Sequence, residues 1–377
     1  MSGIYIHIPF CKQACHYCDF HFSTVMKKRT EMVDALIREI QLRKDELPET
    51  IETIYFGGGT PSVLSTDEIN HIINAVYYHF TVADNPEITL EANPDDLSNE
   101  RIAQMAASRI NRLSIGIQSF FDEDLKLMNR AHNAAEAKQS LGEAAQYFDN
   151  ISIDLIYGIP GMDDEKWRQN IETALSFGIP HISSYALTVE PKTTLHKLVA
   201  TGEIPSPSDE AAAEHFRILY ERLDREGFVH YELSNFGKPG YFSRNNTAYW
   251  LGKKYLGIGP SAHSYDGNSR SWNVANNSLY LKAIAENRLP IETEILSMTD
   301  RYNEYIMTGL RTIWGVSLDR IEQEFGADVI EYLETQSEIF LQQELLVIEN
   351  RVLKTTAKGK FLSDGLASDL FLVNLEG

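Results

Sequence analysis

All three cysteines of the chain lie in one short stretch, at Cys11, Cys15 and Cys18. The spacing C-x₃-C-x₂-C lets three thiolates converge on one metal centre when the loop wraps around it. No fourth cysteine exists to complete the ligand set. The pattern therefore predicts a [4Fe–4S] cluster with one iron open to a substrate. The alternatives are a Cys₃His zinc site completed by His16 or His21, and three unrelated buried thiols.

Charge and cysteine usage limit the class of partner and the compartment. The formal net charge of −20 argues against a nucleic-acid partner, because phosphate binding needs a surplus of Lys and Arg. The N-terminus does not resemble a signal peptide, and no apolar run approaches the ~20 residues of a transmembrane segment. An odd number of cysteines is typical of a reducing compartment rather than of a disulfide framework. We therefore expect a cytoplasmic protein.

Short apolar runs alternate with amphipathic helical stretches over the first 225 residues or so. Such alternation predicts parallel strands joined by right-handed helical crossovers. Six strand–helix units fall short of the eight of a TIM barrel, so we predict an α/β fold with a partial, open (β/α)₆ TIM-like barrel. The expected strands cover residues 4–8, 53–56, 87–91, 112–117, 151–157 and 181–187. The expected helices cover residues 31–45, 66–78 with Thr66 as N-cap, 99–108, 122–128, 134–147, 164–177 and 208–226.

The pattern changes after Gly227, which suggests three parts. We predict a barrel over residues 1–227, an extension of short strands and loops over 228–290, and a small helical, winged-helix-like domain over 291–377. In the last part we expect helices at 299–312, 317–325, 327–335, 337–343 and 358–364, with a hairpin formed by 345–348 and 352–355.

The run Gly57-Gly-Gly-Thr60-Pro61 directly follows the second expected strand. Consecutive glycines let the backbone approach a ligand closely, and free N–H groups there would meet a polar ligand group. The alternative is a tight strand-to-helix turn that needs no ligand. The run lacks the G-x-G-x-x-G pattern, which argues against a Rossmann dinucleotide site.

Three polar residues interrupt or close apolar strands: Glu91, Gln118 and Asp154. Such groups must be solvated or paired. The carboxyl ends of parallel strands share one edge, where the chemistry of α/β folds takes place, so we expect these side chains on one rim. There they can bind ribose hydroxyls or an ammonium group, or they can cap the turns that follow.

Together these motifs resemble a known family. The stretch Tyr5-x-His7-x-Pro9-Phe10-Cys11, the cysteine loop and the segments 57–61, 91–94 and 116–120 resemble the radical S-adenosylmethionine (SAM) enzymes. More narrowly, they resemble the branch of oxygen-independent coproporphyrinogen III dehydrogenase and its heme-chaperone relative, HemW. The resemblance covers nearly the whole chain. It implies that SAM chelates the open iron and is cleaved to a 5′-deoxyadenosyl radical.

The resemblance also implies a set of SAM contacts, which we carry over by position. Arg130 is expected to pair with the SAM carboxylate, and Gln118 and Asp154 to meet the ribose or nearby polar groups. No catalytic residue is assigned. The full set is Tyr5, Gly58, Gly59, Thr60, Glu91, Gln118, Arg130, Asp154 and Ala186.

Two departures favour the heme-chaperone branch. The dehydrogenases carry a further cysteine two residues after the third, where this chain has Phe20. They also carry an N-terminal extension before the first strand, whereas Tyr5 in the first expected strand lies almost at the start of this sequence. The resemblance then implies a protein that binds heme and passes it to respiratory apoproteins, with a reductant protein as a further partner. Oxygen-independent decarboxylation of coproporphyrinogen III propionates is the alternative, and a zinc-stabilised binding module without radical chemistry is the third.

The motifs do not identify the residue that would ligate heme iron. The chaperone branch typically shows His-Asn-x-x-Tyr-Trp, and here Asn245 occupies the histidine position while Asn246, Tyr249 and Trp250 match. An amide is a poor ligand for heme iron compared with imidazole. His263 is therefore a candidate ligand, although a hydrogen-bonded structural histidine after a Gly-rich turn is the alternative.

Overall fold

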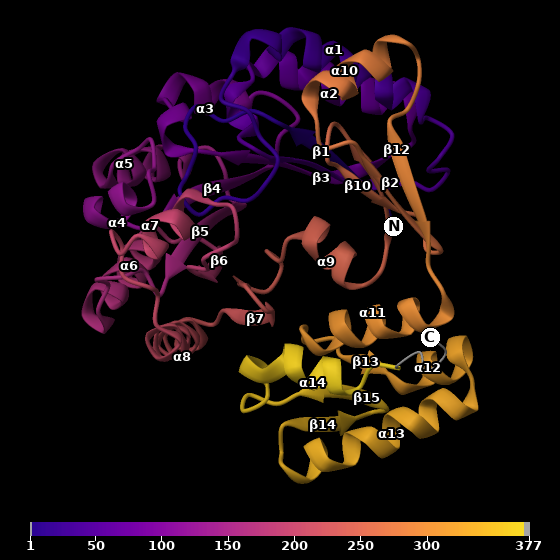
Figure 1. Ribbon diagram of the computed structural model, residues 1–377. Coiled ribbons are helices and arrows are strands. Elements are labelled where there is room, and N and C mark those ends of the chain that lie inside the picture. The colour runs from indigo at the N-terminus through magenta and orange to yellow at the C-terminus, as the bar shows by residue number, and fades with distance from the viewer. Residues whose placement is uncertain (1, 373–377) are drawn as a thin grey trace.

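The computed structural model describes residues 2–372. Its centre is a set of parallel strands that pair in the order of the sequence, which confirms the α/β class and the partial (β/α)₆ barrel. Figure 1 shows them as one curved sheet. The strands are β1 (Ser2–Ile8), β2 (Ile51–Gly58), β3 (Val82–Ala92), β4 (Arg112–Gln118), β5 (Ile151–Tyr157) and β6 (His181–Ala186).

Helices cover the outer side of this sheet (Figure 1). Alternate strand residues such as Ile4, Ile6 and Ile8 are fully buried in the same core as Met32 and Leu36 of the first helix, as a period of two requires. The helices are α1 (Arg29–Leu42), α2 (Thr66–His79), α3 (Asn99–Ala106), α4 (Asp122–Leu127), α5 (Ala134–Ala144), α6 (Asp164–Ser176), α7 (Thr194–Ala200) and α8 (Asp209–Arg225). The sequence pattern did not predict α7.

The N-cap prediction for α2 was wrong by one residue. Ser65, not Thr66, caps the helix, because its hydroxyl accepts the Glu68 N–H while the Glu68 carboxylate accepts the Ser65 N–H. This reciprocal capping box fixes the helix start at Thr66.

The sheet continues beyond β1 and β6 and does not close. At one end β8 (Asn235–Gly237) pairs antiparallel with β6, followed by β7 (Val229–Glu232). At the other end β9 (Lys254–Ile258) pairs parallel with β1 and is followed in the sheet by β10 (His263–Tyr265), β11 (Ser269–Asn273) and β12 (Ile291–Ile295). The helix α10 (Asn277–Ala285) packs on α1. In the described chain β7 and β12 are the two free ends of the sheet, so the barrel is open.

Residues 241–259 were expected to form only short strands and loops, and this was wrong for α9 (Arg244–Trp250). Figure 1 shows this short helix in the hollow of the sheet. The carboxylate of Glu87 in β3 accepts the backbone N–H groups of Arg244 and Asn245, each at 3.1 Å. A distant strand thus supplies the anion that stabilises the helix start, which local sequence cannot reveal.

The C-terminal part has a separate hydrophobic core from Tyr302 to Leu370. It contains α11 (Met298–Leu310), β13 (Val316–Ser317), α12 (Leu318–Phe325), α13 (Ala327–Gln342), β14 (Leu346–Glu349), β15 (Val352–Thr355), a 3₁₀ turn (Lys360–Leu362) and α14 (Ser363–Asp369). Its small sheet has the order β13-β15-β14. The domain boundaries at residues 227 and 290 stay predictions.

The two helices predicted at 327–335 and 337–343 form one helix, α13. The break predicted at Gln336 does not occur. The helix continues through Ser337, whose buried hydroxyl donates to the Leu333 carbonyl one turn earlier. Within residues 2–372, no helix has both the length and the apolar character that crossing a membrane requires.

Candidate iron–sulfur and SAM site

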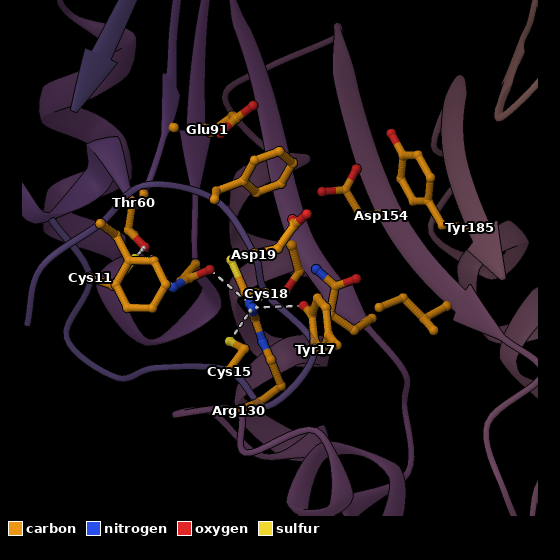
Figure 2. Close-up of a pocket in the computed structure, with 18 of the residues that line it drawn as sticks. Cys11, Cys15, Tyr17, Cys18, Asp19, Thr60, Glu91, Arg130, Asp154 and Tyr185 are labelled. Carbon is orange, nitrogen blue, oxygen red and sulfur yellow. Dashed lines mark hydrogen bonds between the residues drawn. The ribbon is translucent and has the colours of Figure 1, made fainter. Parts of the chain in front are cut away.

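A cavity of about 580 Å³ opens at the carboxyl ends of the parallel strands. All three cysteines line it, together with residues from β2, β3, β4, β5 and β6. Figure 2 shows the cysteine side chains together at one side of the cavity, with Asp154 and Tyr185 across from them. The sequence-predicted residues that line it are Gly58, Gly59, Thr60, Glu91, Gln118, Arg130, Asp154 and Ala186.

Tyr5 is the predicted residue that does not line the cavity. Its ring stacks on Tyr55 at 6.1 Å between centroids, and its ring lies beside Gly57. A Cβ at Gly57 would lie 2.9 Å from the Tyr5 ring and 3.1 Å from the Glu91 carboxylate. Tyr5 therefore supports the floor below the cavity.

Backbone hydrogen bonds hold the cysteine loop at both ends. Cys11 N–H donates to the Ser23 carbonyl at 3.1 Å, and Ser23 N–H donates to the Pro9 carbonyl at 3.0 Å, which closes the base of the loop. Further along, His16 N–H donates to Met128 at 3.0 Å and the His16 carbonyl accepts from Leu195 at 2.7 Å. The loop is thus fixed before any metal binds.

The backbone N–H groups of Gly59 and Thr60 are hydrogen-bonded to the segment that leads into the cysteine loop. The prediction that these N–H groups are free for a ligand was therefore wrong. Gly59 N–H donates to the Ile8 carbonyl at 2.9 Å, and Thr60 N–H donates to the Phe10 carbonyl at 2.7 Å. A Cβ at Gly59 would lie 2.6 Å from the Phe10 carbonyl oxygen. Glycine is needed here because the start of the cysteine loop lies directly against the run.

A hydrogen-bonded chain of side chains connects Cys11 with Cys15. Thr60 Oγ1 donates to Cys11 Sγ at 3.4 Å and accepts from Asn93 Nδ2 at 3.3 Å. Asn93 Oδ1 accepts from Arg130 at 2.7 Å, and Arg130 donates to Cys15 Sγ at 3.3 Å. Figure 2 shows Arg130 reaching Cys15 and Tyr17. Donors aimed at two sulfurs suit thiolate ligands.

The guanidinium of Arg130 is already engaged on both terminal nitrogens. One contacts Cys15 and the Tyr17 hydroxyl, and the other contacts Asn93 and the Gly116 carbonyl. Its buried Nε has no partner within residues 2–372. Pairing of Arg130 with a carboxylate of SAM therefore requires these contacts to rearrange, and it stays a prediction.

The thiols fit a metal cluster chemically. Burial raises the pKa of Cys11 and of Cys18 to about 11, so without metal both hold their protons at neutral pH. Metal binding must therefore displace protons from these thiols. Each cysteine of a cluster binds a different iron, so the three sulfur atoms must lie farther apart than the ligands of a single metal ion do.

The two histidines considered as zinc ligands bind elsewhere. His16 Nδ1 contacts the Leu127 carbonyl at 2.9 Å, and His21 Nε2 contacts Asn277 at 2.7 Å. In the part of the chain that the structure describes, no three His, Cys, Asp or Glu side chains are arranged to hold a single metal ion. The donor set fits a [4Fe–4S] cluster better than a Cys₃His zinc site.

Two carboxyl groups, those of Glu91 and Asp154, line the cavity. Burial is the main cause that raises the pKa of Glu91 to about 7, although the Tyr55 hydroxyl donates to it at 2.8 Å. Burial likewise raises the pKa of Asp154 to about 6, opposed by a hydrogen bond from Ser183. Both groups therefore titrate near neutral pH inside the cavity. Each can accept a hydrogen bond, and each can donate one when it is protonated.

The cavity lining also includes Gln118, which has a φ of 66° and lies in the left-handed region that non-glycine residues rarely adopt. The strand ends at this residue, and the turn directs its largely buried side chain into the cavity wall.

Comparisons with known proteins agree with this geometry. The model of the radical SAM superfamily matches residues 5–174, and that of the HemN C-terminal domain matches residues 296–362. The heme chaperone HemW of Bacillus subtilis is 34% identical over 370 residues, which cover 97% of both chains. This chain belongs to the HemW family. HemW of Lactococcus lactis is likewise 34% identical, over 98% of this chain and 97% of that protein.

A solved structure shares the fold of this chain. It is the coproporphyrinogen III oxidase HemN from Escherichia coli, a radical SAM enzyme, with a TM-score of 0.85 and 21% sequence identity. The likeness covers 98% of this chain and 90% of that one. At this identity it establishes the fold only.

The residue at the histidine position of the HemW motif is buried. Asn245 is 3% exposed, and its side-chain oxygen accepts the Thr53 hydroxyl at 3.1 Å inside the hollow of the sheet. Tyr249 packs edge-on against Tyr255 at 4.5 Å between centroids. His263, the other candidate, is exposed on β10. The side chain of Asn245 is therefore enclosed in the hollow, whereas that of His263 is open to solvent.

Several residues at the cavity were not predicted from the sequence. Asn93 lies in the segment 91–94, of which the sequence analysis considered only Glu91. The segment was therefore predicted to be part of the site, but the role of Asn93 was not. Tyr17 lies between two of the cysteines, and its hydroxyl accepts from Arg130 at 3.4 Å. Tyr185 faces the cavity next to Ala186, and no local signal distinguishes it from an ordinary strand residue.

Proposed function

We propose that this protein is a radical SAM heme chaperone that binds a [4Fe–4S] cluster, SAM and heme, and passes heme to respiratory apoproteins. The observation that carries the proposal is the shared cavity. Cys11, Cys15 and Cys18 line the same space as residues from β2 to β6 at the positions of the family's SAM contacts. Family membership at 34% identity over nearly the whole chain supports the chaperone assignment.

The cysteine thiolates would hold three irons and leave the fourth for the amino and carboxylate groups of SAM. When bound, the cluster supplies the electron that cleaves the sulfonium C–S bond of SAM. Thr60 and Arg130 would donate hydrogen bonds to two of the thiolates, as they do to the free sulfurs.

The remaining residues would orient SAM. Glu91 and Asp154 offer hydrogen-bond acceptors in the cavity lining, suited to ribose hydroxyls or the SAM ammonium group. Gln118 adds an amide to the lining, and Ala186 offers a small apolar surface at the end of β6. Tyr5 would act from below, through Gly57 and Glu91.

The proposal includes partners and place. A reductant protein would supply the electron, and respiratory heme proteins would receive the heme. We place the protein in the cytoplasm. We also retain the division into a barrel at 1–227, its extension at 228–290 and the C-terminal domain at 291–377, whose separate core supports it.

A second candidate function is oxygen-independent oxidation of coproporphyrinogen III, the activity of the other branch that the sequence motifs resemble. Phe20 argues against it, because it occupies the position of the further cysteine in that branch. Its side chain is 69% exposed and lies at the cavity wall. A phenylalanine can neither ligate iron nor transfer a proton there.

Anaerobic reconstitution tests the proposal. We expect iron and sulfide in equal amounts, SAM binding, hemin binding, and transfer of hemin to an apocytochrome. A Cys15→Ser variant should lose the cluster, whereas Ser23→Ala at the base of the same loop should keep it. Stoichiometric zinc without sulfide would support the binding-module alternative instead. Conversion of coproporphyrinogen III at a catalytic rate would replace the chaperone assignment with the dehydrogenase.

A further inference from the structure

The inner face of the sheet extension carries a row of ring side chains. We call the side chains of Tyr255, His263, Tyr265, Arg270 and Trp272 the aromatic face. Cross-strand register pairs His263 with Trp272, and Tyr265 with both Arg270 and Tyr255. The His263 and Trp272 rings are 6.0 Å apart at 32°, and the Tyr255 and Tyr265 rings are 6.2 Å apart at 37°. This is a contiguous surface of mostly planar groups.

The imidazole of His263 is available as a ligand. It is exposed, and it makes no hydrogen bond within residues 2–372. Partial burial and the nearby charge of Arg270 lower the pKa of His263, so at neutral pH the ring is uncharged and keeps a free nitrogen lone pair. This is the form that binds a heme iron.

The backbone that presents this imidazole is tightly fixed. Gly257 permits the approach, because a Cβ there would lie 2.0 Å from the His263 carbonyl oxygen. The next residue, Ser264, accepts the Gly257 N–H at 2.9 Å and a hydrogen bond from the buried Arg43 at 3.2 Å. A ligand held in place before binding loses little conformational entropy when it binds.

Other histidines lack this combination. His71 on α2 and His196 on α7 are also exposed and have no side-chain hydrogen bond in the described part of the chain, but no ring lies beside either of them. Asn245, at the motif position, is buried in the hollow and bonded to Thr53. His79 at the end of α2 lies beside one ring, that of Tyr78 at 4.8 Å between centroids. His263 differs from it because it is exposed and belongs to the row of rings of the aromatic face.

The aromatic face also adjoins the part of α9 that matches the HemW motif. Tyr249 packs on Tyr255 at 4.5 Å, so the Tyr-Trp end of the motif borders the same surface. At the other side, Arg270 forms an ion pair with Glu304 of α11 and has a side chain 40% exposed. A guanidinium at the edge of a flat apolar surface suits a ligand that is planar, apolar and carries carboxylates.

We propose that His263 is the axial ligand of heme iron in this protein, with Trp272 packed beside the macrocycle and Arg270 facing a propionate. The inference rests on the heme binding in the proposed function and assigns it a site outside the SAM cavity. It also explains how this chain can bind heme with Asn245 at the motif position.

Hemin titration of the full-length, cluster-loaded protein tests the inference, with the Soret band and electron paramagnetic resonance (EPR) as readouts. We expect His263→Ala to weaken hemin binding roughly tenfold or more and to remove the histidine-ligated spectrum. Added imidazole should restore that spectrum. Trp272→Leu should weaken binding while the iron keeps its spectrum. The matched controls His71→Ala and His196→Ala should bind hemin as the wild type does.

The outcomes separate this inference from the proposed function. Unchanged affinity and spectrum in His263→Ala, with wild-type binding intact, would overturn the ligand assignment alone. No hemin binding by the wild type would instead contradict the heme part of the proposed function. Cluster content and SAM binding are measured in each variant, and values equal to the wild type show that the fold and the cavity are intact.

Discussion

Replacing Glu91 with glutamine should change how the stability of the protein depends on pH. Burial at the cavity raises the pKa of Glu91 to about 7, whereas a glutamate in an unfolded chain titrates near 4.3. Between these values the folded protein binds more protons than the unfolded chain. The free energy of unfolding therefore falls as pH rises through this window, and the full loss is present above pH 7.

The size of the effect follows from the two pKa values. Each tenfold change in proton affinity is worth about 1.4 kcal/mol, so Glu91 destabilises the fold by about 3.7 kcal/mol at high pH, of which about 2.5 kcal/mol develops between pH 5 and pH 8. Part of the carboxyl group is open to the cavity. Water there reduces the effect, and we expect about 2 kcal/mol.

Urea unfolding of cluster-free protein at pH 5 and pH 8 measures this difference. Relative to Glu91→Gln, the wild type should lose about 2 kcal/mol of unfolding free energy between the two pH values. Glu100→Gln, on the exposed side of α3, is the matched control and should leave the pH dependence of the wild type unchanged. A wild-type advantage or deficit that is equal at both pH values would refute the account of a buried Glu91 whose pKa is raised on folding.

Three further predictions address other contacts. Glu39→Gln should lower the unfolding free energy by roughly 3 kcal/mol in urea titrations, because it leaves the buried Arg43 without its fully buried partner. Asn93→Ala should keep the cluster but lower its midpoint potential by roughly 50 mV in an EPR redox titration. The reason is that Thr60 and Arg130, which donate to two sulfurs, lose their hydrogen bonds to Asn93. An unchanged potential would contradict this. Lys360→Met should cost about 1 kcal/mol in thermal unfolding by removing contacts to His230 at 3.2 and 3.3 Å.

The parallel core of the fold could be predicted from the sequence because its signals are local. The strand at Ile151–Tyr157 was predicted to the residue, and the other core strands overlap their predictions. The reason is that alternating apolar residues pack under the helices on one face and reach the hollow on the other. The same physics gave the rim on which Glu91, Gln118 and Asp154 meet the cysteines.

Features that depend on distant partners could not be predicted. The helix α9 contains Asn245, Asn246 and Thr247, which favour helices weakly, and its start is stabilised by Glu87 from another strand. The pairing of β9 with β1 joins segments more than 240 residues apart. The N–H groups of Gly59 and Thr60 looked free in sequence because their partners lie in the cysteine loop.

EPR of the reduced, reconstituted protein with and without SAM tests the central claim most directly. That claim is that Cys11, Cys15 and Cys18 hold a [4Fe–4S] cluster whose open iron faces the SAM cavity. The account predicts a reduced-cluster signal whose g values change when SAM is added, and loss of that signal in Cys18→Ser. A cluster signal that SAM leaves unchanged, or a protein that takes up zinc and no sulfide, would contradict it.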